Sequence, residues 1–205
     1  NFYKSYFFQS SKELPFIDAK LAISKDFLTI NKKEKWITNS KSRKVGNFLR
    51  SRYDCILSTS KTINHDNSLL NCRIESLEHK SPAVAVVDRL FKIKKNLKLF
   101  KDKSREIFIF TESNNNIKEK YFKKIGINII KLKKSHKLKS DVSEVFFFLK
   151  QLGFNRILIE SGIKYINVVL KNNLIRNFYL FKSSFSLRSN GKNNTKSNLI
   201  KKLKT

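Results

Sequence analysis

The chain has 205 residues, which is enough for one domain with a sizeable buried core. Its 44 lysines and arginines against 16 acidic residues give a net charge of +28 and a pI near 10.2, which suggests a polyanionic partner such as nucleic acid, an anionic membrane surface or a phosphorylated ligand. Most of the basic residues are lysines spread along the whole chain, and arginine is scarce. A generally basic, solvated surface is therefore favoured over a dedicated nucleic-acid groove.

The remaining composition excludes several other classes of protein. Cys55 and Cys72 belong to no CxxC motif and have no paired histidine, so we expect neither a metal site nor a disulfide framework, as suits a reducing cytoplasm. The longest apolar runs, such as residues 145–149, are far shorter than the roughly 20 residues of a membrane span. The chain has no methionine and begins at Asn1 without a signal-like segment, so we interpret it as part of a longer product whose N-terminal portion is missing.

Between Pro15 and Ser183 apolar strands are interspersed with amphipathic helices. Apolar runs predict strands at residues 16–23, 55–58, 83–87, 107–111, 127–132, 156–159 and 177–181. Helical periodicity predicts helices over residues 40–52, over 117–125, from 140 until Gly153 and from 163 to about 173. The strands are continuously rather than alternately apolar. This pattern predicts an α/β fold of three layers, in which helices flank a mostly parallel central sheet.

The first predicted helix has an amphipathic pattern. Ser40 is its expected N-cap, and Val45, Phe48 and Leu49 lie on one apolar face. Trp36, the only tryptophan, precedes this helix, and such a residue is more often a core or hinge anchor than a stacking platform.

Both ends of the chain differ from its middle. Residues 1–14 are rich in aromatic residues and serine without a sustained period, which is typical of a linker or docking arm. Residues 184–205 are rich in asparagine, lysine and serine around the single Gly191, which indicates a disordered or truncated tail. We therefore predict that residues 15–183 form the folded domain.

Residues that follow strands are the candidates for a site, because ligands of α/β sheets bind beyond the carboxyl ends of the strands. The standard glycine-rich fingerprints for nucleotides are absent, and so is the H-x-E with P-C-x-x-C pattern of a zinc deaminase. Glu160, Ser161 and Gly162 join a strand to a helix, whose free N–H groups suit a phosphate. The alternative, favoured from the triplet alone, is that Ser161 only caps this helix. A carboxylate at Glu160, at the rim of the sheet, needs a partner.

Three basic residues also admit two interpretations each. Lys20 lies in the first strand, either at an edge with its ammonium reaching solvent or aimed at a site. Arg50 and Arg73 are separately typical of surface arginines, although together they could clamp one phosphate. Arg73 ends the stretch 62–73, whose asparagines and aspartate predict a turn.

In order along the chain, these pieces resemble one known family. The runs are PFIDAKLAISKD, KWITNSKSRKVGNFLRSRYDCILSTSKTINHDNSLLNCR, AVAVVD, RILIESG and LIRNFYLFKS. Together they are similar to the reductase domain of the bacterial bifunctional riboflavin-biosynthesis deaminase/reductase, over about residues 15 to 183. The family pattern is W-I-T, a helix ending in arginine, T-x-x-x-D, and an arginine seven positions beyond that aspartate. Its counterparts here are Trp36-Ile37-Thr38, Arg50, Thr62, Asp66 and Arg73.

This resemblance implies a dihydrofolate-reductase-like fold and the use of NADPH. It implies reduction of the ribosylamino side chain of 5-amino-6-(5-phosphoribosylamino)uracil to the ribitylamino form. A zinc deaminase domain precedes the reductase domain in the family, so residues 1–14 would be its trailing linker, and the fold commonly forms homo-oligomers. We expect a cytoplasmic enzyme with a phosphoribosylaminopyrimidine substrate and no resident metal.

The resemblance also implies roles for individual residues. The NADPH contacts would be Ala22, Trp36, Thr62, Asp66, Gly162, Ile163 and Lys164. The substrate contacts would be Arg50, Leu70, Arg73 and Glu160, with Glu160 beside the sugar. A hydride must reach the first sugar carbon, and an acid must protonate the departing oxygen or nitrogen. Lys20, Asp66 and Glu160 are the candidates for that acid.

The sequence departs from the family pattern at several positions. Lys33 to Lys35 replace the usual Gly-x-Ser, Phe27 replaces an expected glycine, and Asn67-Ser68 replaces Asp-Pro. Gly162-Ile163-Lys164 replaces Gly-Pro-Thr, and the final strands of the family have no clear counterpart after Ser183. Two alternative functions therefore stay open: a degenerate reductase domain kept for its packing, and a basic nucleic-acid-binding α/β protein.

Overall fold

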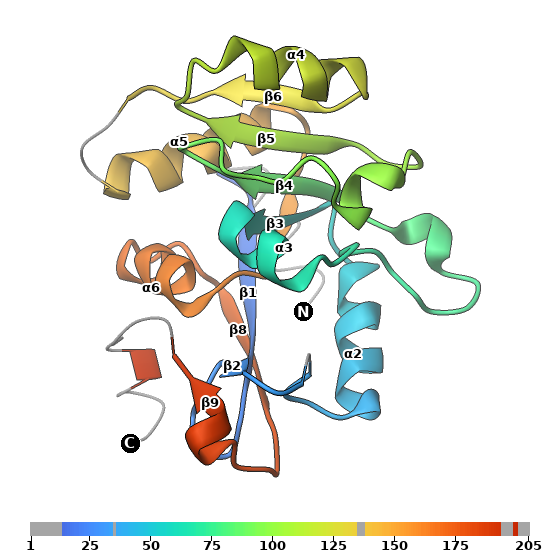
Figure 1. The fold of residues 1–205 in the computed structure, drawn as a ribbon, viewed down its shortest axis with the longest axis vertical. Helices are drawn as coiled ribbons and strands as arrows, with labels where there is room; N and C mark the ends of the chain where they lie inside the picture. The colour runs from blue at the N-terminus through green and yellow to red at the C-terminus, as the bar shows by residue number, and fades with distance from the viewer. Residues whose placement is uncertain (1–13, 35, 135–137, 194–198, 201–205) are drawn as a thin grey trace.

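A seven-stranded sheet forms the centre of the part of the chain that the computed structural model describes, residues 14–34, 36–134, 138–193 and 199–200. All of its strand pairs are parallel, in the order β6-β5-β4-β3-β7-β1-β8 (Figure 1). The strands are β1 (Phe16–Ile23), β3 (Cys55–Thr59), β4 (Ala83–Val87), β5 (Ile107–Thr111), β6 (Asn128–Lys131), β7 (Arg156–Ile159) and β8 (Asn177–Lys182). The predicted parallel sheet is confirmed, and each predicted strand is present.

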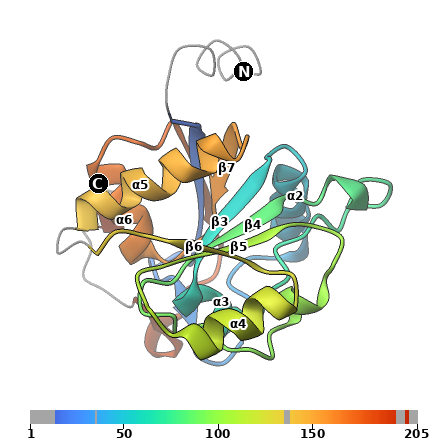
Figure 2. The same ribbon diagram turned by 90° about the horizontal axis from the view of Figure 1, so that it is seen from above.

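Helices cover both faces of this sheet, as predicted (Figure 2). The helices are α2 (Ser40–Arg50), α3 (Ser60–Asp66) and α4 (Asn116–Lys124) on one face, and α5 (Leu138–Gln151) and α6 (Ile163–Lys171) on the other. Val145 of α5 and Ile166 of α6 pack into one buried apolar cluster. Ile63 of α3 and Phe122 of α4 pack into a second cluster across the sheet. Two apolar cores therefore hold the sheet from both sides.

The alternation of β1 directs its polar side chains to one face only. Ile17, Ala19 and Leu21 belong to the core under α5 and α6. Asp18 and Lys20 must then face the side of α2 and α3, because successive side chains of a strand point to opposite faces. Strand β1 thus presents Lys20 toward α2.

The helix α2 differs from its prediction at its start and on its apolar face. Asn39, not Ser40, is the N-cap, since its side chain accepts the N–H of Ser42 at 2.9 Å. Val45 and Phe48 are 51% and 45% exposed, so these two residues of the predicted apolar face point to solvent, whereas Leu49 packs against the second core. The only fully buried residue of α2 is Gly46, and its inward side carries Leu49 together with the polar Asn47 and Arg50.

The stretch 62–73 was predicted as a turn, and its first five residues instead belong to α3. Thr59 caps this helix by accepting the Thr62 N–H, and Ile63 is fully buried beneath it. Asn67 ends it in the left-handed conformation, at φ 43°. A cap at each end and one buried apolar anchor outweigh the turn propensity of the intervening asparagines. Residues 67–73 form neither helix nor strand, as predicted.

Part of the predicted tail is folded onto the domain. Strand β9 (Gly191–Lys192) pairs antiparallel with β2 (Ile30–Asn31) beyond the carboxyl ends of β1 and β8, at the bottom of Figure 1. Residues 184–193 therefore belong with the domain, although the sequence places them in a tail. Of the predicted linker, residues 1–14, only Leu14 is among the described residues, and it packs against the first core. No helix within the described ranges is both long and apolar enough to cross a bilayer.

Candidate functional site

The candidate site lies where parallel strands end together, as their common direction requires. Glu160 directly follows β7, α3 directly follows β3, and both strands neighbour each other in the sheet. Lys20 of β1 lies on the other side of β7. Helix α2 stands beside this region on the same face of the sheet (Figure 1).

A buried ion pair joins Arg50 at the end of α2 to Glu160. The Arg50 Nε donates to Glu160 Oε1 at 2.6 Å, and its Nη2 donates to Oε2 at 3.0 Å. The remaining Nη1 donates to the Asn47 Oδ1 at 3.2 Å and to the Asn71 backbone oxygen at 3.0 Å. The two charged side chains are only 12% and 10% exposed. This bidentate geometry fixes both groups and gives Glu160 the partner that its position demands.

The pKa of Glu160 shows how strongly its charge is stabilised. Burial raises this pKa, but attraction to Arg50 and the hydrogen bonds from it, followed by attraction to Lys20 and Arg73, lower it to about 2. The Lys20 Nζ lies 3.9 Å from Glu160 Oε2. Glu160 is therefore a carboxylate at neutral pH, with the Arg50 guanidinium and the Lys20 ammonium beside it. Arg50 and Lys20 contact Glu160 directly, whereas Arg73 acts on it only through longer-range attraction, so the predicted place of Arg73 in the site stays a prediction.

Lys20 is aimed at this cluster. Strand β1 lies between β7 and β8, so the interpretation of Lys20 as an edge residue is wrong. The side chain is 23% exposed, its register partner on β8 is Tyr179, and its Nζ lies 5.4 Å from the centre of the Phe181 ring. The aromatic ring and the Glu160 carboxylate together hold the ammonium at the site.

A second group of residues meets at the start of α6. The Thr62 Oγ1 accepts the Gly162 N–H at 3.2 Å and lies 3.1 Å from Thr59 Oγ1, which in turn lies 3.2 Å from Ser161 Oγ. Gly162 is the N-cap of α6, without a side-chain cap, so the interpretation of Ser161 as the cap is wrong. Lys164 is exposed in the first turn. The result is a helix N-terminus with a hydroxyl and a lysine beside it, which suits an anionic group.

Four other predicted site residues, Trp36, Asp66, Ala22 and Leu70, do not belong to the Glu160 ion-pair cluster. Trp36 is 45% exposed beneath Arg43, whose Cζ lies 5.1 Å from the indole ring, so the core-anchor interpretation is wrong. Asp66 ends α3 and pairs with the neighbouring His65 at 2.7 Å. Ala22 is half-buried on β1, and Leu70 is 5% exposed, with its side chain in the second core. Their predicted ligand contacts stay predictions.

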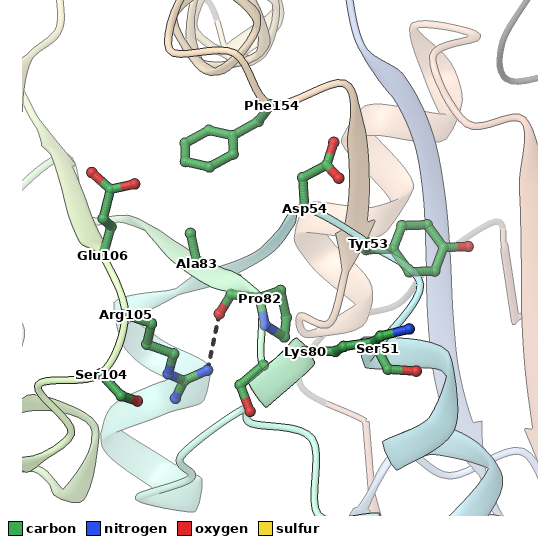
Figure 3. Close-up of a pocket in the computed structure, with 11 residues that line it drawn as sticks. Ser51, Tyr53, Asp54, Lys80, Pro82, Ala83, Ser104, Arg105, Glu106 and Phe154 are labelled. Atoms are coloured by element: carbon green, nitrogen blue, oxygen red, sulfur yellow. Dashed lines mark hydrogen bonds between the residues drawn. The ribbon is translucent and has the colours of Figure 1, made fainter. Parts of the chain in front are cut away.

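A depression of about 450 Å³ lies at the opposite, amino-terminal edge of the sheet (Figure 3). Arg105 and Lys80 contribute positive charge to its lining, and Asp54 and Glu106 contribute negative charge. The Arg105 guanidinium is engaged by Asp102 and by backbone oxygens, including that of Pro82 at 3.1 Å. This arginine holds the loop that follows α3, and the mixed charge of the depression defines no ligand.

Comparison with known proteins identifies the family. Residues 15–201 match the model of the RibD C-terminal domain. This chain belongs to the RibD C-terminal domain family. It is 32% identical to the riboflavin biosynthesis protein RibD of Buchnera aphidicola subsp. Baizongia pistaciae over 193 residues, which cover 87% of this chain and 50% of that protein.

Two further relatives extend this result. A 5-amino-6-(5-phosphoribosylamino)uracil reductase of Buchnera aphidicola subsp. Acyrthosiphon pisum is 26% identical over 162 residues, which cover 74% of this chain and 75% of that protein. The structure of Acinetobacter baumannii RibD superposes with a TM-score of 0.77 and 18% identity, covering 95% of this chain and 52% of that one. The chain thus spans about half the length of the RibD proteins that it matches. The predicted dihydrofolate-reductase-like fold is confirmed.

Several residues of this RibD C-terminal domain site are missed by sequence reasoning. Asn47 lies three positions before Arg50 on the same helix face, so helical spacing could have found it. Asn71 contributes a backbone oxygen, and no side-chain signal marks such a role. Tyr179 and Phe181 flank Lys20 through the register of β8 with β1, which only the folded sheet defines.

The residues at the start of α6 fit the phosphates of a dinucleotide. Gly162 caps α6 without a side chain, and its N–H donates to Thr62 Oγ1, so the Thr62 hydroxyl is held at the helix N-terminus. Ile163 is 2% exposed in the core, so only its backbone N–H is available to a ligand. No group of three or more His, Cys, Asp or Glu in the described ranges could hold a metal ion.

Proposed function

We propose that this chain is the reductase of 5-amino-6-(5-phosphoribosylamino)uracil and that it uses NADPH. The observation that carries the proposal is the cluster in which Lys20 and Arg50 hold the Glu160 carboxylate, with attraction from Arg73, next to the N-terminus of α6. The fold class and the family match agree with a reductase, and a relative of nearly matching length carries that name.

The cofactor phosphates would bind at the start of α6. The Thr62 hydroxyl, the backbone N–H of Ile163 and the Lys164 ammonium supply donors and positive charge there, while the Gly162 N–H donates to Thr62 Oγ1 and holds this hydroxyl in place. Trp36, Ala22 and Asp66 would contact the rest of NADPH, as the resemblance implies. When bound, the cofactor supplies the hydride for the first carbon of the opened sugar.

The substrate phosphate would bind Arg73. The Arg73 side chain is exposed and close enough to Glu160 to lower its pKa, whereas the Arg50 guanidinium already makes four hydrogen bonds to protein groups. We therefore assign Arg50 to holding Glu160 and α2 in place, and Arg73 to the substrate, with the backbone at Leu70 nearby. Glu160, held as an anion, would accept hydrogen bonds from the sugar hydroxyls.

Among the three candidates for the acid, Lys20 is best placed. Reduction of the open-chain imine adds a hydride to carbon and a proton to the nitrogen or to the departing oxygen, so a protonated group must lie at the site. With a pKa of about 2, Glu160 has no proton to give at neutral pH. The Asp66 carboxylate is 45% exposed and paired with His65. The Lys20 ammonium faces the cluster, and it would deliver the proton.

The partners of the chain are also part of the proposal. RibD relatives are about twice as long as this chain, so we infer that a deaminase domain in the same polypeptide supplies the substrate. We expect a homo-oligomer. Two departures from the family pattern favour the alternative of a degenerate domain. Lys33 and Glu34 are exposed in the altered loop, and Phe27 has a φ of 63°, a conformation that suits the glycine of the family better than phenylalanine.

One substitution separates these alternatives. In the proposed enzyme, Arg73→Ala raises KM for the deaminated substrate by tenfold or more, because a charge-assisted contact to phosphate is lost. Arg52→Ala is the matched control, since Arg52 is exposed at the Phe48 ring outside the cluster. Equal kinetics for wild-type protein and Arg73→Ala contradict the assignment of Arg73. A wild-type protein without substrate-dependent NADPH oxidation is a degenerate domain, and preferential, salt-dependent RNA binding indicates the nucleic-acid alternative.

A further inference from the structure

The segment of residues 185–193, which we name the C-terminal strap, is bound along the loop that follows β1. The Phe185 backbone oxygen accepts the Lys25 N–H at 2.9 Å, and the Asn190 backbone oxygen accepts the Lys32 N–H at 2.8 Å. Asn193 accepts the Thr29 N–H at 2.9 Å through Oδ1. The strap therefore contacts this loop along most of its length, at the end of the sheet where β1 and β8 stop (Figure 1).

Asp26 anchors the middle of the strap. Its Oδ1 accepts the Ser24 hydroxyl at 2.5 Å and the Leu187 N–H at 3.0 Å, and its Oδ2 accepts the Arg188 N–H at 2.7 Å. The pKa of Asp26 is lowered to about 2. The hydrogen bond from Ser24 has the largest effect, burial opposes it slightly, and the hydrogen bonds from the two backbone N–H groups lower the pKa further. Both carboxylate oxygens are engaged, so an asparagine here would place its amide N–H₂ against a donor.

Gly191 allows the strap to approach this closely. A Cβ added at Gly191 would lie 2.7 Å from the Leu187 Cβ, which is closer than real Cβ contacts, and 3.0 Å from the Leu28 Cβ, which is tighter than most of them. Substitution by alanine would push β9 away from the loop, without any change of charge. The glycine is explained by this contact, although the sequence places it in a disordered tail.

The loop held by the strap continues to Trp36 and the start of α2. Asn31 of β2 pairs with Gly191, and its Oδ1 accepts the N–H groups of Lys33 and Glu34 at 3.0 and 3.2 Å. Its Nδ2 donates to the Trp36 backbone oxygen at 3.4 Å. Helix α2, which carries Arg50, begins four residues beyond Trp36. The strap, Asn31 and Trp36 thus form a continuous line of contacts toward α2.

We propose that the C-terminal strap positions the loop of residues 31–34 and, through Asn31, the expected cofactor contact Trp36, and that Asp26 and Gly191 are the positioning residues that hold this loop. The inference rests on the proposed function, because it takes the Glu160 cluster as the reductase site. It assigns the strap a role in cofactor affinity. A loop that the strap does not hold must lose conformational freedom when the cofactor binds, and this entropy cost lowers the affinity.

A comparison of three variants tests this role. Asp26→Ala removes the carboxylate that accepts the N–H groups of the strap. Gly191→Ala leaves that carboxylate in place and pushes the strap away by a steric clash. Asp54→Ala is the matched control, because the Asp54 Oδ2 accepts two backbone N–H groups at 2.8 Å at the opposite edge of the sheet. Hydrogen exchange of the Lys33 and Glu34 amides in the ligand-free protein, and the dissociation constant of NADPH, are measured for each variant.

We expect both strap variants to exchange these amides at least tenfold faster and to bind NADPH about three- to tenfold more weakly, while Asp54→Ala resembles the wild type in both. The inference is overturned if the amides exchange at the wild-type rate, or if they exchange faster and the NADPH affinity is unchanged. Wild-type protein that does not bind NADPH contradicts the proposed function instead, and the exchange rates still decide whether the strap holds the loop.

Discussion

Replacement of Arg50 by methionine tests whether the Glu160 carboxylate is truly buried and paired. Methionine keeps an unbranched apolar stem but removes the guanidinium, so the Glu160 side chain, which is 10% exposed, would lose its main partner. Removal of one partner of a buried pair costs about 3 to 5 kcal/mol. The pKa of Glu160 gives a similar figure: it falls from an ordinary 4.5 to about 2, and at about 1.4 kcal/mol per pKa unit this corresponds to about 3 kcal/mol.

The assay is urea unfolding of wild type, Arg50→Met, Glu160→Gln and the double variant at pH 7. We expect Arg50→Met to lose about 3 kcal/mol in the free energy of unfolding, and the double variant to lose less, because it leaves no buried charge. Because the folded pKa of Glu160 is depressed, its stabilisation is present above pH 4.5 and is lost as the pH falls toward 2. A coupling energy below about 1 kcal/mol, typical of exposed pairs, would refute this reasoning.

Three further substitutions test separate parts of the structure. Lys20→Gln should lower kcat by about 10²- to 10⁴-fold as the proton donor is lost, and steady-state turnover within threefold of wild type would exclude that role. Thr62→Val should weaken NADPH binding by up to about tenfold because the hydroxyl beside Gly162 is lost, whereas Thr62→Ser should not; equal calorimetric affinities would contradict the cofactor assignment. Tyr53→Phe removes the donor that lies 2.5 Å from the buried Asp18, so the free energy of unfolding should fall by about 1 to 3 kcal/mol, and a loss below 0.5 kcal/mol in urea would show that Asp18 is otherwise satisfied.

The sheet was predictable because its information is local. Strands such as β4 and β5 are continuous apolar runs, and only a strand buried on both faces tolerates such a run. The pairing of Arg50 with Glu160, in contrast, joins residues 110 positions apart, and no periodicity records such a contact. The resemblance to a family, and not the pattern itself, grouped these residues before the fold was known.

The errors have physical reasons of the same kind. Val45 and Phe48 form an apolar stripe that ordinarily faces a core, but Asn47 and Arg50 occupy the inward side of α2 because they serve the Glu160 cluster. The strands β2 and β9 have two residues each, too few for any period to be read. The contact of Asp26 with the strap spans 162 positions, and a segment rich in asparagine and lysine carries no apolar signal to predict it.

Transfer of deuterium from labelled cofactor to product tests the central claim most directly. The full chain is incubated with 5-amino-6-(5-phosphoribosylamino)uracil and NADPH that carries deuterium at the transferable position, and the product is examined by mass spectrometry and NMR. The proposed function predicts a ribitylamino product with deuterium on the first carbon of its side chain, formed by wild type and strongly reduced in Lys20→Gln. Recovery of unchanged substrate with wild-type protein, or a reduced product without the label, would contradict it.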